Sequence, residues 1–155
     1  HAEAPYDWEA KEALLTKRLE ALSVEELRSY SAQWDFAMKK AYDWGLWAAA
    51  YVIHGGCSDD SFSDFRSTVI MLGRETFEAA LADPDSLLPI AERCSGDLYH
   101  ENFGYPVMRV WEQKTGDDAP PSAAPLPFGT EPSGEDWDED DLPQRVPKLW
   151  AKYGS

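Results

Sequence analysis

The sequence predicts an all-α fold, a compact multi-helix bundle with an irregular, acidic and proline-rich C-terminal arm. Three observations lead to this class. Apolar residues recur at helical spacing over most of the first 116 residues. Helix-capping residues stand in front of several of these segments, and no convincing strand alternation occurs. Hydrophobic residues make up 43% of the 155 residues, which is enough for a packed core.

We expect three segments along the chain. Residues 1–116 form the helical domain, residues 117–142 form the arm, and residues 143–155 form a short C-terminal helix that docks on the domain. Seven of the eleven prolines lie between Asp117 and Pro147, together with a run of acidic residues, and this composition indicates an irregular connection. Bulky apolar residues return after it and predict the docking helix.

The first two helices are predicted as an antiparallel hairpin. Leucines at helical spacing predict a helix over residues 7–21. Ser23 and Glu26 have the spacing of a capping box, in which each side chain accepts a bond from the other residue's backbone N–H. The apolar stripe of the second helix runs from Leu27 to Ala41, and the short break between the helices favours the hairpin.

A strongly apolar helix follows and is expected at the centre of the bundle, because it is apolar on nearly all sides. Gly45 near its start predicts a kink or a very short break. Gly55 ends it, since glycine readily adopts the left-handed conformation that closes a helix. One face carries Trp44, Trp47, Tyr51 and His54, and the neighbouring face carries Leu46, Ala49, Ala50 and Ile53.

The next helix begins after a turn that contains two glycines. Its apolar residues recur at helical spacing, and Gly73 either ends it or bends it. Four consecutive residues are N-cap candidates for this helix, because their side chains accept bonds from free backbone N–H groups. They are Ser58, Asp59, Asp60 and Ser61.

Shorter elements are expected in the rest of the domain. Residues 74–81 form a helix, and a turn at residues 83–86 caps one or two helical turns over residues 87–94. A last helix begins near Pro106, because proline suits the first turn of a helix, and Gly116 ends it.

The net charge of the chain disfavours some classes of binding partner. Its 29 acidic and 14 basic residues give a formal net charge of −15. Nucleic acids and anionic membranes select basic proteins, so neither is expected as a partner. A basic protein or a cationic ligand is compatible with this charge.

The chain lacks the sequence signals of export and of membrane insertion. No apolar run reaches the length of a transmembrane helix, and no signal peptide opens the chain. We therefore expect a cytoplasmic protein. Cys57 and Cys94 are expected to be reduced, partly buried thiols.

The central stretch resembles a known protein family. The signature is Trp44-x-Leu46-Trp47-x-Ala49-Ala50-Tyr51-x-Ile53-x-Gly55-Gly56-Cys57-Ser58-Asp59-Asp60-x-Phe62. It is similar to the bacterial family called domain of unknown function 4240, and the likeness extends over most of residues 6–116. The resemblance implies a small helical protein and carries over no activity, cofactor or partner. Gly45 and the pair Ser67-Thr68 depart from the family pattern.

Polar residues of several kinds meet where the central helix ends and the next one begins. The candidate binding residues are His54, Ser58, Asp59, Asp60, Asp64, Arg66 and Arg74. One interpretation is a pocket in which the carboxylates and the imidazole act as acid and base or bind a cation. In the structural alternative, Asp59 and Asp60 cap a helix, Arg66 pairs with one of them, and His54 caps the preceding helix.

Other chemistries find less support in the sequence. No metal site and no cofactor are expected, because no cysteine pair has zinc spacing and the acidic run near residue 138 lacks the glycine and closing glutamate of a calcium loop. The turn at Gly55-Gly56 is a poor phosphate site, since carboxylates follow it and no lysine stands at P-loop spacing. Cys57 is a candidate nucleophile, but the adjacent acids raise the pKa of its thiol.

Three classes of function remain open, and the sequence does not decide whether the protein is an enzyme. The first is a non-enzymatic interaction or regulatory module that binds a basic protein through its acidic surface. The second is a small-molecule enzyme or sensor with its site at the turn from His54 to Arg66. The third is a DNA mimic, in which acidic side chains imitate phosphates. The large aromatic residues are expected to lie in the core or to line a ligand pocket.

Overall fold

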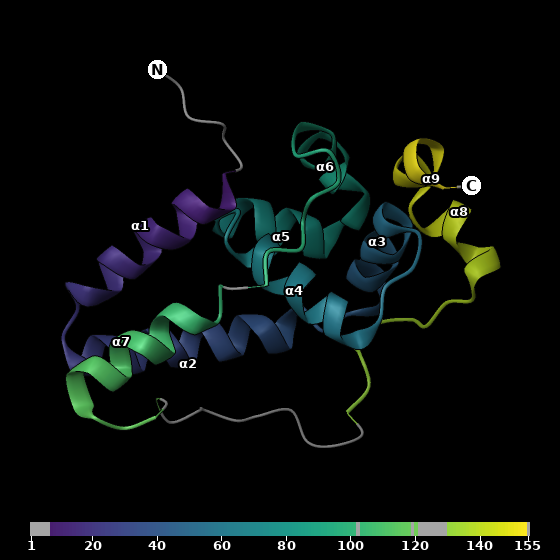
Figure 1. Ribbon diagram of the computed structural model, residues 1–155. Coiled ribbons are helices and arrows are strands. Elements are labelled where there is room, and N and C mark those ends of the chain that lie inside the picture. Colours follow the sequence, from purple (N-terminus) through teal and green to yellow (C-terminus); the bar gives the residue numbers. More distant parts are fainter. Residues whose placement is uncertain (1–6, 102, 119, 121–129, 155) are drawn as a thin grey trace.

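The computed structural model describes residues 7–101, 103–118, 120 and 130–154 (Figure 1). Within this part of the chain the regular structure is helical throughout, without a β-strand, and the predicted all-α class is confirmed. None of the described helices combines the length and the apolar character needed to cross a membrane.

The described residues form nine α-helices. They are α1 (Trp8–Glu20), α2 (Val24–Lys40), α3 (Trp44–His54), α4 (Asp59–Ile70), α5 (Arg74–Ala82), α6 (Leu88–Arg93), α7 (Tyr105–Thr115), α8 (Leu142–Arg145) and α9 (Pro147–Tyr153). Short 3₁₀ helices precede α6 and α8, at Pro84–Leu87 and Glu139–Asp141.

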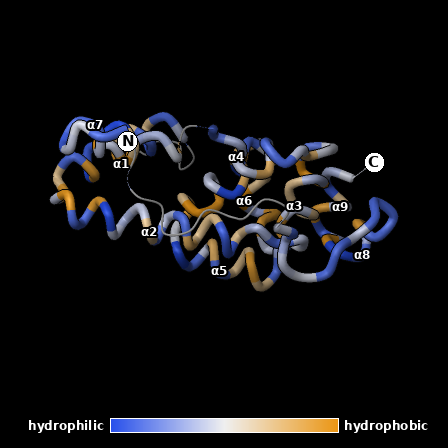
Figure 2. Tube along the Cα trace, turned by 90° about the horizontal axis from the view of Figure 1, so that it is seen from below, coloured by the Kyte–Doolittle hydropathy of each residue, from blue (hydrophilic) through white to orange (hydrophobic). Residues whose placement is uncertain are grey.

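The helices form two groups that share the long helix α2. Helix α7 packs against both α1 and α2 at one end of the molecule, and α3, α8 and α9 lie at the other end (Figures 1 and 2). The smaller of two apolar cores lies between α1, α2 and α7 and consists of Leu19, Leu27, Val107, Val110 and Trp111. The larger core surrounds α3.

Capping side chains fix the starts of the first two helices. The Ser23 hydroxyl accepts a hydrogen bond from the N–H of Glu26 at 3.2 Å, and the Glu26 carboxylate accepts one from the N–H of Ser23 at 3.0 Å. This is the predicted capping box, and it is confirmed. Asp7 caps α1 by accepting from the N–H of Ala10.

The break between α2 and α3 lies slightly earlier than the sequence predicts. Gly45 lies inside the first turn of α3, and the break between the two helices falls before Trp44. The prediction of a kink or a very short break at Gly45 is therefore wrong in position. The Asp43 carboxylate accepts from the N–H of Leu46 at 3.0 Å and begins the helix there. A Cβ at position 45 would lie 3.0 Å from Asp43 Oδ2 and 3.3 Å from Pro84 Cγ, so this close approach favours glycine.

Helix α3 is the centre of the larger core, as its composition predicts. Leu46 and the three alanines that follow Trp47 are fully buried. Gly55 closes the helix in the left-handed conformation, with φ 68°, and its N–H donates to the carbonyl of Tyr51. The C-terminal segment of the chain packs beside α3 (Figure 1).

Residues 130–154 run back over α3. The N–H of Ser133 donates to the carbonyl of Tyr42 at 2.9 Å, and the N–H of Trp44 donates to the carbonyl of Ser133 at 2.8 Å. Two short helices follow, α8 and α9, where the sequence predicts one. Leu142, Val146 and Leu149 are each at most 1% exposed and form part of the larger core. Residues 119 and 121–129 of the expected arm lie outside the described residues.

A buried carboxylate anchors this C-terminal segment. The side chain of Asp85 is almost fully buried and accepts from the backbone N–H groups of Lys148 and Leu149, at 2.9 and 2.8 Å. These two N–H groups belong to the first turn of α9, where a helix has no internal acceptors of its own. Asp85 therefore caps a helix that lies more than sixty residues further along the chain.

Candidate functional site

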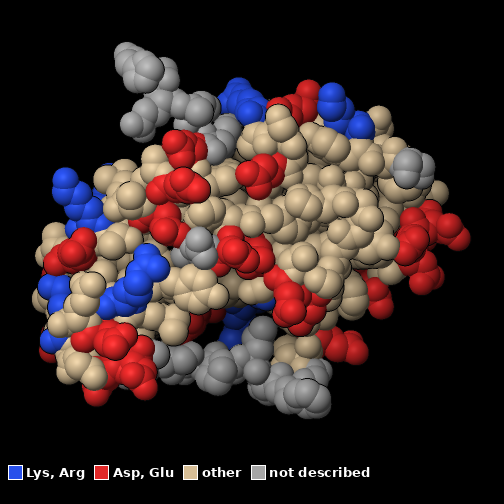
Figure 3. Space-filling view, in the orientation of Figure 1, with Lys and Arg blue, Asp and Glu red and all other residues tan. Residues whose placement is uncertain are grey.

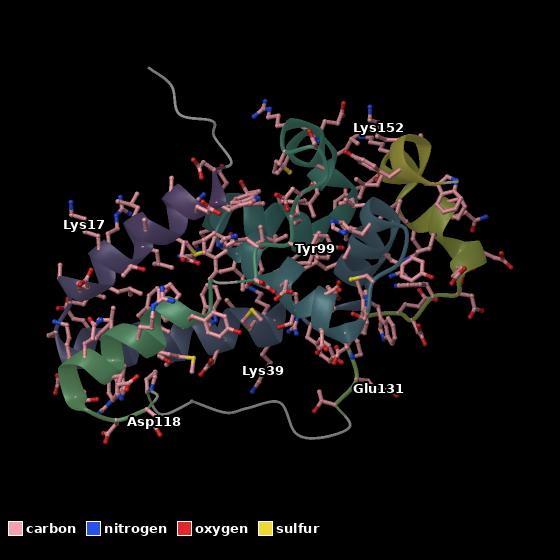
Figure 4. All side chains as sticks on the ribbon, viewed as in Figure 1. Lys17, Lys39, Tyr99, Asp118, Glu131 and Lys152 are labelled. Atoms are coloured by element: carbon pink, nitrogen blue, oxygen red, sulfur yellow. The ribbon has the colours of Figure 1, made fainter. Side chains whose placement is uncertain are left out.

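The structure places the predicted site residues in several environments and does not assemble them into one pocket. His54 Nε2 lies 2.9 Å from the carbonyl oxygen of Gly96 and donates to it, because a carbonyl can only accept. The imidazole packs against the ring of Tyr99, which lies near the middle of the molecule in Figure 4. Burial lowers the pKa of His54, against the opposing effects of Gly96 and Asp97.

The turn before α4 supplies the residue that caps the start of this helix. The Ser58 hydroxyl accepts from the N–H of Ser61 at 3.2 Å, so Ser58 is the N-cap among the four candidates. Asp59 and Asp60 are exposed in the first turn of α4, where a negative charge is favourable because of the helix dipole. The structural alternative assigned the cap to Asp59 and Asp60, and this assignment is wrong because Ser58 is the N-cap and the two aspartates lie in the first turn.

Arg66 ties α4 to the end of α2. Its side chain is buried, and Nη1 donates to the carbonyl of Met38 at 2.8 Å. The guanidinium carbon lies 4.9 Å from the ring centre of Tyr42 and 5.0 Å from that of Phe62, so both aromatic faces contact the cation. No ion pair between Arg66 and Asp59 or another acid is formed in the described part of the chain, and the predicted pairing is wrong.

Three carboxylates on and near α4 interact electrostatically, and we call them the acidic face: Asp60, Asp64 and Glu101. Burial raises the pKa of Asp64, and the neighbouring charges of Glu101 and Asp60 raise it further, while His100 lowers it. Asp60 and Asp64 lie four residues apart, so they share one side of the helix. Glu101 joins them through the fold alone, and no local sequence signal identifies it.

Arg74, the last predicted residue, lies at the start of α5. It forms an exposed ion pair with Glu78, with 3.1 Å between Nε and Oε1. Both residues line a groove between α2 and α5, which we call the α2–α5 groove. Arg74 is the only one of the seven predicted residues that lines this groove.

The α2–α5 groove has a volume of about 630 Å³ and is lined mainly by apolar side chains. Its apolar lining includes Tyr30, Trp34, Phe36, Ala37, Met71 and Phe77. Phe36 is 67% exposed, which is unusual for a phenylalanine. Burial raises the pKa of Tyr30 to about 12, as expected for a phenol in apolar surroundings. The sequence shows the aromatic stripe of α2, but it does not show which part of the stripe the fold leaves uncovered.

Most of the chain matches one known family model. The family model described as protein of unknown function (DUF4240) matches residues 1–113. The chain belongs to this family. The resemblance of the central stretch is thereby confirmed, and the acidic face and the α2–α5 groove both lie within the matched residues of the DUF4240 chain. No curated protein and no solved structure matches it.

The aromatic face of α3 in the DUF4240 protein is partly buried under Trp137 of the C-terminal segment. Trp137 packs edge-on against Trp44 and Tyr51, with ring centres 6.1 and 5.3 Å apart, and its Nε1 donates to the carbonyl of Trp44 at 2.8 Å. Trp111 lies in the smaller core. Trp34 is the tryptophan that lines the α2–α5 groove.

The remaining candidate chemistry of the DUF4240 chain is weak. Burial raises the pKa of the Cys57 thiol, and Asp59 and Asp64 act in the same direction, so the nucleophilic thiolate is disfavoured. The described residues contain no cluster of three or more side chains that could hold a metal ion. In the acidic run, Asp141 accepts from the N–H of Asp138 at 2.9 Å within a 3₁₀ helix.

Proposed function

We propose that this DUF4240 protein is a non-enzymatic interaction or regulatory module that binds a basic protein through its acidic face. The observation that supports this is the raised pKa of Asp64, which is due first to burial and then to repulsion by Glu101 and Asp60. None of the three forms an ion pair with a lysine or arginine in the described residues. The isolated protein therefore retains an unfavourable charge cluster that the Lys and Arg residues of a partner would neutralise.

The charge of the wider surface also favours a basic partner. Acidic side chains are spread over the whole face in Figure 3, including its lower left, and outnumber the visible Lys and Arg side chains, most of which lie toward its left and upper edges. The net charge of −15 attracts a basic protein over a distance of roughly one Debye length, about 8 Å at physiological salt. Charge complementarity of this kind increases the rate of association and selects against acidic partners.

The enzyme or sensor at the turn from His54 to Arg66 is less well supported by the geometry. A catalytic group has to lie within hydrogen-bond reach of its reaction partner. His54 bonds the Gly96 carbonyl and Arg66 bonds the Met38 carbonyl, so these two side chains serve separate contacts. No specific feature of the described residues favours the DNA mimic over a protein-binding surface.

The test is capture from a lysate of the source organism with a neutralised acidic face. The variant carries Asp60→Asn, Asp64→Asn and Glu101→Gln. Its matched control, Glu20→Gln with Glu92→Gln and Glu112→Gln, removes the same charge from exposed positions elsewhere. We expect the wild type and the control to retain one basic protein at about 0.05 M salt and release it at about 0.5 M, and the variant to lose it. Equal losses in both triple variants, or a partner that neither affects, would contradict the proposal.

A further inference from the structure

The α2–α5 groove has the size and the lining of a site for a small amphiphile. Ligand sites in proteins are mostly apolar concavities of about 300–1,000 Å³, and the groove falls within this range at about 630 Å³. Trp34 and Ala37 contribute from α2 and Phe77 contributes from α5, so both walls present apolar side chains.

The shape of the groove favours an elongated ligand. Its α2 wall extends from Ser29 to Lys40, and a helix rises about 1.5 Å per residue, which gives a wall of about 16 Å. This length exceeds that of an extended decanoate. Tyr30, Trp34 and Ala37 lie on successive turns of α2, so a hydrocarbon tail parallel to the helix would contact each of them in sequence.

The charges of the groove are opposite in sign to those of the whole chain. Three ionisable side chains with a charge at pH 7 line it: Lys40, Arg74 and Glu78. Arg74 and Glu78 pair with each other, which leaves Lys40 at the end of α2 without an ion pair in the described residues. This single unpaired positive charge suits a negative head group, and the groove is therefore distinct from the acidic face in the ligand it suits.

We propose that the α2–α5 groove binds an anionic amphiphile, a molecule with an unbranched apolar tail and a single carboxylate. The tail lies against Trp34, Ala37 and Phe77, and the carboxylate meets the ammonium group of Lys40. Burial of the tail supplies most of the affinity, because transfer of each CH₂ group from water is worth about 0.8 kcal/mol. Lys40 supplies the preference for a negative head group.

The experiment compares decanoate, 1-decanol and decyltrimethylammonium below their micelle concentrations, by calorimetric titration into the full chain. We expect the order decanoate, decanol, decyltrimethylammonium from tightest to weakest. Lys40→Ala is expected to weaken decanoate binding about 2- to 5-fold and to leave decanol binding unchanged, because it removes one exposed charge interaction. Lys39→Ala is the matched control, since Lys39 is exposed, does not line the groove and projects from α2 in Figure 4.

Several outcomes would overturn the inference. They are an absence of decanoate binding, equal affinity for the three head groups, and binding that Lys40→Ala leaves unchanged. A dimer in light scattering that Phe36→Asp separates would place a second copy of the chain in the groove and would also refute it. The triple variant of the acidic face is expected to bind decanoate as the wild type does. Decanoate binding therefore tests the groove independently of the test of the proposed function.

Discussion

Asp85 illustrates how a single side chain can join segments that are distant in the sequence. Its carboxylate satisfies two backbone N–H groups at the start of α9, and its own N–H donates to the Asp83 carboxylate at 3.1 Å. The sequence identifies residues 83–86 as a turn, but the turn signal does not reveal the contact with α9. Proline and aspartate are common in turns, so the turn alone accounts for the residues at these positions. The sequence therefore gives no sign that one of them contacts a distant helix.

Replacement of Asp85 by asparagine tests this anchor. The substitution keeps the size of the side chain but exchanges one acceptor oxygen for an NH₂ group that faces a backbone N–H. A buried donor without an acceptor costs about 1–3 kcal/mol, so we expect Asp85→Asn to lower the free energy of unfolding in urea by that amount. Asp140→Asn, at an exposed position, is the control and is expected to change it by less than about 0.5 kcal/mol. Similar values for the two variants would show that Asp85 is not an anchor.

Local signals account for the elements that the sequence predicts well. Ser23 and Glu26 lie three residues apart and bond each other, so the start of α2 depends on nothing beyond its first turn. The partner of Arg66 was predicted incorrectly because the Met38 carbonyl lies 28 residues away and only the packing of α4 on α2 brings the two together. For the same reason the sequence suggests two members of the acidic face but not Glu101.

The cap of α4 provides a test at the level of the helix. Removal of a serine N-cap typically costs about 1 kcal/mol, because a backbone N–H in the first turn loses its acceptor. We expect Ser58→Ala to lower the free energy of unfolding by about that amount and Ser58→Asp to preserve it. Ser63→Ala, inside the same helix, is expected to be neutral or slightly stabilising, since alanine favours helices more than serine does. The role of Ser58 as the cap would be refuted by an equal loss in Ser58→Ala and Ser58→Asp.

At the scale of the whole molecule, the net charge of −15 opposes folding through repulsion among the acidic side chains. Raising the salt concentration from about 0.01 M to about 0.1 M shortens the Debye length from about 30 Å to about 10 Å and weakens this repulsion. We expect the thermal midpoint to rise by about 2–4 °C, which corresponds to roughly 1 kcal/mol for a chain of this size. The triple variant of the acidic face is expected to show a smaller rise. A midpoint that falls with salt would mean that attractive ion pairs outweigh the repulsion.

The anchor at Asp85 also has a consequence for the order in which the protein is made. Asp85 is translated 64 residues before Leu149, whose backbone it binds. At about 5–20 residues per second, a ribosome needs about 3–13 s to cover that interval. During this time one side of α3 is not yet covered by the C-terminal segment. The carboxylate of Asp85 also lacks the backbone N–H groups of α9 that it binds in the folded protein. The final packing of the protein therefore follows translation of α9, and the newly made chain is most vulnerable to aggregation and proteolysis before that point.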